Sequence, residues 1–320
     1  MPDRFFDHHK LLASVLSLAA LGLCLTLPGA LAADQAKKPP KANAKESPKA
    51  EPKTAPKAAP KGAAKAVKPL QSKIGIRVAR KGWGGDDGNG VKKILDSTAN
   101  ELWILFPKRT LDPIYVRRSH DGPIVLFKRS PKGEHQVKLD IEDLHWSQYA
   151  FQFGHEVCHI LCNYRDRKNP NKWFEESLCE LASLFVLRRM AKTWKTSSNR
   201  FWRSYAPSHD QYAQQRIDAS TLPKGKTLAK WYRENEPALR ANATDRKKNN
   251  IVAVVLLPLF EKQPQQWQAL SAMNKGNAKP KESFKDYLIR WRANAPKQHK
   301  SFIDDIAKQF DIKLPQATTK

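Results

Sequence analysis

Acidic residues, cysteine and long apolar runs are scarce in this sequence. Only 31 Asp and Glu residues oppose 57 Lys and Arg residues, so the formal net charge is +26. Such a charge either attracts polyanions, such as acidic lipid headgroups or wall polymers, or serves only to keep the protein soluble. The longest apolar run after residue 32, residues 251–260, contains Pro258 and is too short to cross a bilayer. We therefore expect a mature protein that is soluble or peripheral to a membrane.

The one long apolar segment lies at the N-terminus and has the features of a secretory signal. Residues 11–32 are almost entirely apolar, Arg4 and Lys10 precede them, and Ala30-Leu31-Ala32 is a small-x-small cleavage site. Residues 1–32 are therefore predicted to be a signal peptide, which implies export to the periplasm or the extracellular space. The alternative is an uncleaved membrane anchor. Export makes nucleic acid an unexpected partner.

Residues 33–72 lack aromatic side chains and consist mostly of Ala, Lys and Pro. Repeated proline interrupts helix and sheet, and no hydrophobic core can form, so this stretch is predicted to be a disordered linker. Its lysines would also allow it to bind anionic envelope polymers or a membrane surface.

After residue 72, strand signals occur only between residues 74 and 141. Residues 74–78 alternate like a strand, and residues 91–106 have helical periodicity. Residues 82–90 superficially resemble a calcium loop but lack its ligand spacing, so they are predicted to be a turn. Three further strands, separated by hairpin-type turns at residues 120–122 and 130–133, are predicted at residues 113–116, 123–128 and 136–141.

Helical periodicity dominates from Trp146 onward. One helix extends to about Leu161, Asn169-Pro170-Asn171 interrupts the pattern, and a second helix is predicted over residues 172–190. The rest of the chain, to about Phe310, has only helix signals. The predicted fold class is therefore α+β, with a small mixed or antiparallel sheet, two helices that carry the site described next, and an all-helical C-terminal part.

The first of these two helices contains the pattern HExxH, in His155-Glu156-Val157-Cys158-His159. Residues four apart on an α-helix differ by about 40° around its axis, so both imidazoles point to the same side and can bind one ion. Glu156 lies next to them and can act on water as a general base. The pattern therefore predicts one Zn²⁺ per chain, with His155 and His159 as ligands.

Catalytic zinc takes three protein ligands and keeps one open position, so a third ligand is needed. Glu176 and Glu180 on the second predicted helix are four apart and share a face. One of them is expected to bind the metal while the other accepts a hydrogen bond from a ligand histidine. Glu175 points about 100° away from Glu176. It is expected to face solvent or to balance the charge of the helix N-terminus.

Three cysteines follow residue 32, namely Cys158, Cys162 and Cys179. In an oxidising compartment Cys162 or Cys158 could form a disulfide with Cys179 and join the two helices. The alternative is that all three are buried free thiols.

Together these motifs resemble the gluzincins, the clan of zinc peptidases that includes thermolysin and the aminopeptidase N group. The resemblance rests on HExxH at residues 155–159 and on the sequence Trp-x-x-Glu from Trp173 to Glu176 in the following helix. The Trp-x-x-Glu form is closer to the aminopeptidase branch and to the compact minigluzincins. Ser177 stands where these families usually have glycine, and no glycine-rich motif for binding a substrate amine precedes the helix.

The resemblance implies a zincin-like catalytic domain over residues 73–198, followed by a helical region over residues 199–320. It implies that Glu176 is the third zinc ligand and that Glu180 orients a ligand histidine. It also implies that Glu156 is the catalytic base in the hydrolysis of peptide bonds.

A substrate site follows from the same resemblance. In such folds the edge strand before the motif helix pairs with an extended peptide, which here assigns residues 136–141 to β-augmentation of a peptide or protein substrate. The residues of this strand that alternate on one face are Val137, Leu139 and Ile141. The oxyanion-stabilising residue is not identified, and the candidates are Tyr205, His209, Tyr212 and Tyr232.

Two other functions remain open. The chain could be a wall- or surface-binding protein that keeps the fold without the activity, with a structural zinc. It could also be a latent peptidase that its own tail or C-terminal helices inhibit. The presence of Glu156 favours an active enzyme, because a structural zinc site has no use for a base.

Overall fold

A computed structural model describes residues 74–315, so the predicted signal peptide (1–32) and linker (33–72) lie outside the described residues. No helix in the described range is long and apolar enough to span a membrane. The elements follow one another in this order: β1 (Ile76–Val78), α1 (Asn89–Trp103), β2 (Ile114–Arg118), β3 (Ile124–Leu126), β4 (His135–Leu139), α2 (Trp146–Leu161), α3 (Lys172–Lys195), α4 (Arg200–Asp218), α5 (Leu228–Ala241), α6 (Arg246–Lys262), the 3-10 helix η1 (Pro264–Ala272), α7 (Phe284–Asn294) and α8 (Lys297–Gln309).

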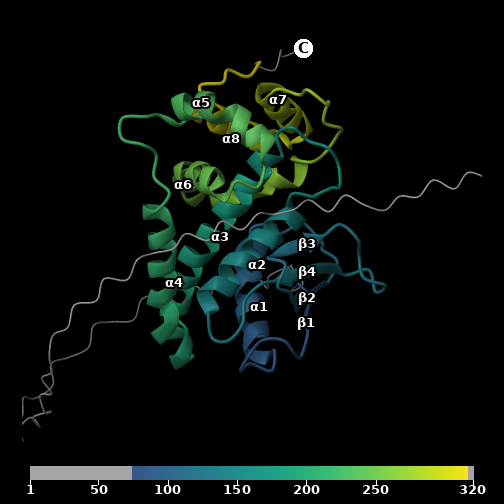
Figure 1. Cartoon of the computed structure of the whole chain (residues 1–320), viewed down its shortest axis with the longest axis vertical. Coiled ribbons are helices and arrows are strands. Elements are labelled where there is room, and N and C mark those ends of the chain that lie inside the picture. Colours follow the sequence, from purple (N-terminus) through teal and green to yellow (C-terminus); the bar gives the residue numbers. More distant parts are fainter. Residues whose placement is uncertain (1–73, 316–320) are drawn as a thin grey trace, which may run out of the picture. The chain divides into compact units, whose positions relative to one another are not determined.

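The strands of the described range form one mixed sheet in the order β1-β2-β4-β3 (Figure 1). β1 pairs with β2 in parallel, β2 pairs with β4 in parallel, and β3 runs antiparallel to β4. The α+β class and the predicted strands are confirmed, with ends that differ by a few residues.

Two expectations about this sheet are wrong. The turn at residues 120–122 does not close a hairpin, because β2 pairs with β1 and β4 rather than with β3. The strand predicted at residues 136–141 is not an edge strand, because β4 lies between β2 and β3. Its proposed substrate-binding side chains are buried in the core: Val137, Leu139 and Ile141. The edge next to β4 belongs to β3, which has one partner strand among the described residues.

The turn at residues 82–90 uses its acidic side chains to start α1. Asp86 Oδ1 accepts hydrogen bonds from the backbone N–H groups of Gly88 (2.6 Å) and Val91 (3.4 Å). Gly88, the N-cap of α1, has a φ of 87°, a left-handed conformation that favours glycine. The segment is therefore the strand-to-helix turn that its sequence predicts.

Helix α3 lies at the centre of the described part of the chain. Every side chain from residue 173 to residue 187 is buried, and α3 contacts α2, α4 and α6 (Figure 1). A helix that is buried on all sides must hydrogen-bond or pair the polar groups that it carries. Its glutamates are therefore placed among protein groups rather than in water.

The N-terminal end of α3 is anchored by aromatic side chains from the later helices. The ring of Trp173 packs against Phe284 of α7 at 4.8 Å between centroids, and against Tyr232 of α5 at 5.5 Å. Phe174 contacts Phe284 and Trp291. The C-terminal helices thus hold the segment of α3 that carries the candidate ligands.

Helices α2 and α3 approach each other closely at Gly154. A Cβ atom at this position would lie 2.8 Å from Val186 Cγ2 and 3.5 Å from the Cα atom of Ser183. Only glycine leaves room for this approach, which places the HExxH face of α2 against α3.

Candidate metal centre

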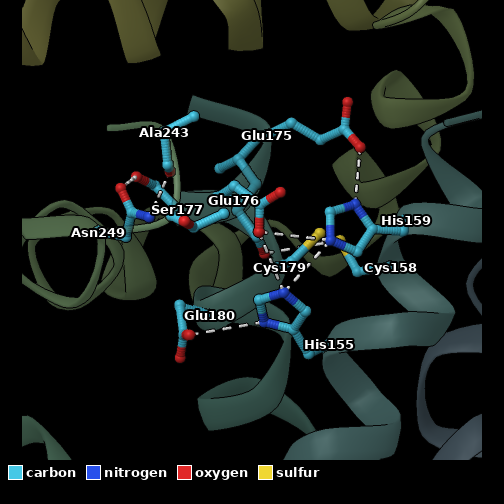
Figure 2. A network of polar contacts seen from close by, with 12 residues as sticks. His155, Cys158, His159, Glu175, Glu176, Ser177, Cys179, Glu180, Ala243 and Asn249 are labelled. Atoms are coloured by element: carbon cyan, nitrogen blue, oxygen red, sulfur yellow. Dashed lines mark hydrogen bonds and ion pairs between the residues drawn. The ribbon is translucent and has the colours of Figure 1, made fainter. Parts of the chain in front are cut away.

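Three donor atoms from α2 and α3 meet in one place. The Nε2 atoms of His155 and His159, one turn apart on α2, are separated by 3.2 Å. Glu176 Oε2 on α3 lies 3.3 Å from the Nε2 of His155 and 3.5 Å from that of His159. Figure 2 shows the three side chains pointing toward one another. The structure thus brings together the three residues that the sequence predicts as metal ligands.

This triangle has the dimensions of a metal site. Nitrogen and oxygen ligands lie about 2.0–2.1 Å from zinc, so two ligands in a tetrahedral arrangement are about 3.3–3.4 Å apart. The separations between the donor atoms of His155, His159 and Glu176 are 3.2, 3.3 and 3.5 Å. The side chains therefore fit a tetrahedral ion with three protein ligands.

A second group of donors overlaps the first. The donor atoms of His155, His159 and Cys179 all lie within 4.8 Å of one another, so this group could also hold a metal ion. Glu176 differs from Cys179 in that it lines the adjacent pocket, and its Oε2 atom lies 3.3 and 3.5 Å from the two histidine Nε2 atoms. Cys179 is completely buried behind them.

The three cysteines of the described range are free, buried thiols. The sulfur atoms of Cys158 and Cys162 are 4.0 Å apart, and Cys158 Sγ donates to the carbonyl oxygen of Leu178 at 3.6 Å. Burial raises the pKa of the Cys162 and Cys179 thiols well above the ordinary value. Of the two alternatives that the sequence leaves open, the structure has the free thiols.

His159 is oriented by a carboxylate on its other side. Its Nδ1–H donates to Glu175 Oε1 at 2.7 Å, and Asn274 Nδ2 donates to Glu175 Oε2 at 2.7 Å. The expectation that Glu175 faces solvent is wrong, since only 3% of the residue is exposed. Because α3 is buried on all sides, the face 100° from Glu176 meets protein, and His159 reaches it from the last turn of α2.

Glu180 lies beside the other histidine. Its Oε1 is 3.6 Å from His155 Nδ1, which is longer than a hydrogen bond, and its Oε2 has no hydrogen-bond partner. The proposed role of Glu180 as the acceptor for a ligand histidine therefore stays a prediction.

Glu156 is buried next to the histidine pair, with 2% of its surface exposed. Burial raises the pKa of its carboxyl group, against the opposing effect of His155 and His159. The backbone N–H of Val125 in β3 also donates to it. A carboxylate with a raised pKa is a stronger base toward water.

The pKa of the Glu176 carboxyl group is lowered despite its burial. Burial alone would raise the pKa of this carboxyl group, but contacts with His155 and His159 outweigh it and lower the pKa. The ammonium group of Lys172 lies 3.3 Å from its Oε1 atom. A lowered pKa favours the carboxylate form, which is the form in which a glutamate binds a metal ion.

A pocket of about 280 Å³ opens in front of these groups. It includes His155, Glu156, His159 and Glu176. One of its walls comes from β3 and the adjoining residues and is apolar: Pro123, Ile124, Val125 and Phe127. Ile124 and Phe127 are 44% and 49% exposed, so this wall offers apolar surface to a ligand.

The remaining pocket residues include several that sequence reasoning missed, namely Tyr164, Thr244, Arg246 and Asn249. The hydroxyl of Tyr164 donates to the carbonyl oxygen of Leu126 at 2.7 Å. Its position five residues after His159, just beyond the end of α2, was the one available sequence signal. None of the four oxyanion candidates lines this pocket: Tyr205, His209, Tyr212 and Tyr232.

Comparison of the chain with known protein families, curated proteins and solved structures finds no match. What the site can do follows from its own donors, charges and pocket.

Proposed function

We propose that this chain is a zinc-dependent peptidase of the gluzincin type. In this proposal His155, His159 and Glu176 bind the metal, and Glu156 is the catalytic base. The observation that carries the proposal is the triangle of donor atoms, 3.2–3.5 Å on a side, next to a buried carboxylate at a pocket. A site that only stabilised the fold would need neither the pocket nor Glu156.

Zinc held by these residues would supply Lewis acidity, which polarises a carbonyl group and lowers the pKa of water. Glu156 accepts a proton from the attacking water on its carboxylate and then donates that proton to the nitrogen of the leaving amine. Glu175 keeps the proton of His159 on Nδ1, so that Nε2 is free to act as a ligand.

The substrate is expected to lie along β3 rather than along β4. β3 has a free edge among the described residues and forms the apolar wall of the pocket. An extended peptide can add to such an edge through main-chain hydrogen bonds. Its apolar side chains would then contact Ile124 and Phe127, the two exposed residues of that wall.

The test combines metal analysis with turnover. We expect one zinc per chain in the wild-type protein and in Glu156→Gln, because Glu156 is not a ligand. Peptide cleavage should fall about 10²- to 10⁴-fold in Glu156→Gln, the usual contribution of a general base. A wild-type protein without zinc after metal-replete purification, or equal turnover by Glu156→Gln, would contradict the proposal.

A structural metal site is the second candidate, and the position of Cys179 favours it. If Cys179 joined the two histidines and Glu176, the ion would have four protein ligands and no open position. Cobalt substitution distinguishes the two arrangements, because a thiolate ligand adds a charge-transfer band in the near ultraviolet. Such a band that disappeared in Cys179→Ser would favour the structural site. Its absence, with metal binding lost in Glu176→Ala, would favour the catalytic one.

A further inference from the structure

One charged side chain of the pocket has no role in the proposed reaction. Two of the pocket residues are permanent cations, Lys172 and Arg246. Lys172 forms ion pairs with Glu176 at 3.3 Å and with Glu175 at 4.0 Å. Arg246 is exposed, and its side chain has neither a hydrogen bond nor an ion pair within residues 74–315. It is therefore the cation of this pocket that is available to a ligand.

Hydrogen bonds between α3 and the start of α6 fix the position of Arg246. The hydroxyl of Ser177 donates to the carbonyl oxygen of Trp173 at 2.9 Å and shares its proton with Asn249 Oδ1 at 3.3 Å, and Asn249 Nδ2 donates to the carbonyl oxygen of Ala243 at 2.8 Å (Figure 2). Asp245 caps α6, whose first residue is Arg246. The serine that replaces the glycine of the resembled family thus ties the start of α6 to the metal centre. This tie holds Arg246 at the rim of the pocket.

The acidic side chains of the pocket leave Arg246 as the group best placed to bind an anionic ligand. Glu156, Glu176 and Glu180 also line the pocket, and their charges offset that of a bound Zn²⁺ ion, so their end of the pocket offers an incoming carboxylate little net attraction. Residues of β3 offer it only apolar side chains. A guanidinium group, by contrast, binds a carboxylate through two parallel hydrogen bonds.

We propose that Arg246 recognises a carboxylate of the substrate, so that the preferred substrates are acidic peptides. This inference rests on the proposed peptidase function and names its substrate class. The carboxylate could belong to an Asp or Glu side chain or to the C-terminus of the peptide. Arg246 and the candidate metal ligands line the same pocket of about 280 Å³, so the carboxylate is recognised within the pocket where the bond is cleaved. The net charge of +26 would also speed the approach of such peptides.

The test uses three peptides of one length and otherwise identical sequence. The first has an internal Glu and an amidated C-terminus, the second has Gln and an amidated C-terminus, and the third has Gln and a free C-terminus. For the wild-type protein we expect kcat/KM to be about ten- to a hundredfold higher for the first or the third peptide than for the neutral second one. Which of the two is preferred identifies the source of the carboxylate.

Variants of α6 assign this preference to one side chain. Arg246→Gln should abolish the ratio between the acidic and the neutral peptide, and Arg246→Glu should reverse it in favour of a peptide with Lys in place of Glu. Lys247→Gln removes the neighbouring charge, which does not line the pocket, and should keep the wild-type ratio. A wild-type protein without preference, or a preference that survives Arg246→Gln, would overturn the inference while leaving the peptidase function intact.

A binding measurement separates this inference from the function on which it rests. Glu156→Gln should bind the fluorescently labelled acidic peptide more tightly than the neutral one, and the double variant Glu156→Gln/Arg246→Gln should not. If this difference appeared but the wild-type protein cleaved none of the peptides, carboxylate recognition would stand and the peptidase function would fail. If the double variant bound both peptides as Glu156→Gln does, carboxylate recognition by Arg246 would be wrong.

Discussion

Glu175 Oε1 lies 2.7 Å from His159 Nδ1, and the second oxygen of the same carboxylate is held by Asn274. Glu175 thus connects a predicted metal ligand on α2 with the segment that follows η1. A carboxylate in this position fixes the tautomer of the histidine and makes it a stronger ligand.

Glu175→Gln should therefore weaken zinc binding without removing a ligand. The expected loss of affinity is about 10- to 100-fold, measured by competition with a chromophoric chelator. Glu180→Gln is the matched control on the same helix, because its carboxylate is 3.6 Å from His155 and makes no hydrogen bond to it. A larger loss of zinc affinity in Glu180→Gln than in Glu175→Gln would mean that Glu180, not Glu175, is the carboxylate that supports the ligand histidines.

Gly154→Ala should destabilise the protein by about 1–3 kcal/mol, as overpacking does in a tightly packed core. The added Cβ would meet the stiff, buried side chain of Val186 at 2.8 Å and push α2 away from α3. Urea unfolding measures the cost. Gly85→Ala provides the control, because a Cβ there has no neighbour closer than 4.0 Å. Equal stabilities of the two variants would show that α2 and α3 can separate freely.

Acid should destabilise the protein through His209. This side chain is buried, its Nδ1 lies 3.0 Å from Ser147 Oγ, its Nε2 has no partner, and burial lowers its pKa to about 4. The unfolded chain, with an ordinary histidine pKa near 6.5, binds the proton more tightly. The contribution of neutral His209 to the free energy of unfolding is therefore complete above about pH 6.5. It is lost as the pH falls toward 4, and the loss is on the order of 3 kcal/mol.

The measurement is the free energy of unfolding between pH 7 and pH 4 for wild type and His209→Gln. The variant is less stable at pH 7 but should show a shallower loss on acidification. Parallel curves would mean that His209 does not titrate in this range.

Metal removal should lower the thermal stability of the whole folded part. An ion that binds only the folded chain stabilises it by about 4 kcal/mol when its free concentration is a thousand times Kd. Chelation should therefore reduce the unfolding temperature of wild type but not that of Glu176→Ala, which lacks the third ligand. Identical unfolding temperatures with and without the chelator in wild type would contradict the metal centre.

The convergence of His155, His159 and Glu176 could be predicted because it depends on local geometry. Helical periodicity fixes which residues share a face, and the proline-containing break at residues 169–171 separates the two helices. Once α2 and α3 pack together, these side chains have to meet.

The environment of Glu175 and the identity of the edge strand depend on contacts between distant parts of the chain. Solvent exposure of Glu175 is the natural expectation for a helix with one buried face, but α3 is buried on all sides. Similarly, alternating residues reveal that 136–141 is a strand without revealing its neighbours, and the parallel pairing of β2 with β4 encloses it. Arg246 was missed because a single arginine seventy residues after the last ligand carries no local signal.

The burial of residues 173–187 of α3 also bears on the order in which the site forms during synthesis. The three predicted ligands are synthesised within a stretch of 22 residues, from His155 to Glu176, whereas the helix that completes the pocket begins only at Arg246. A chain leaving the ribosome would therefore carry all of its metal donors well before α6 covers the apolar surface of α3. Recognition by Arg246 can arise only after α6 has docked, so a nascent chain that already held metal would not yet select its substrates.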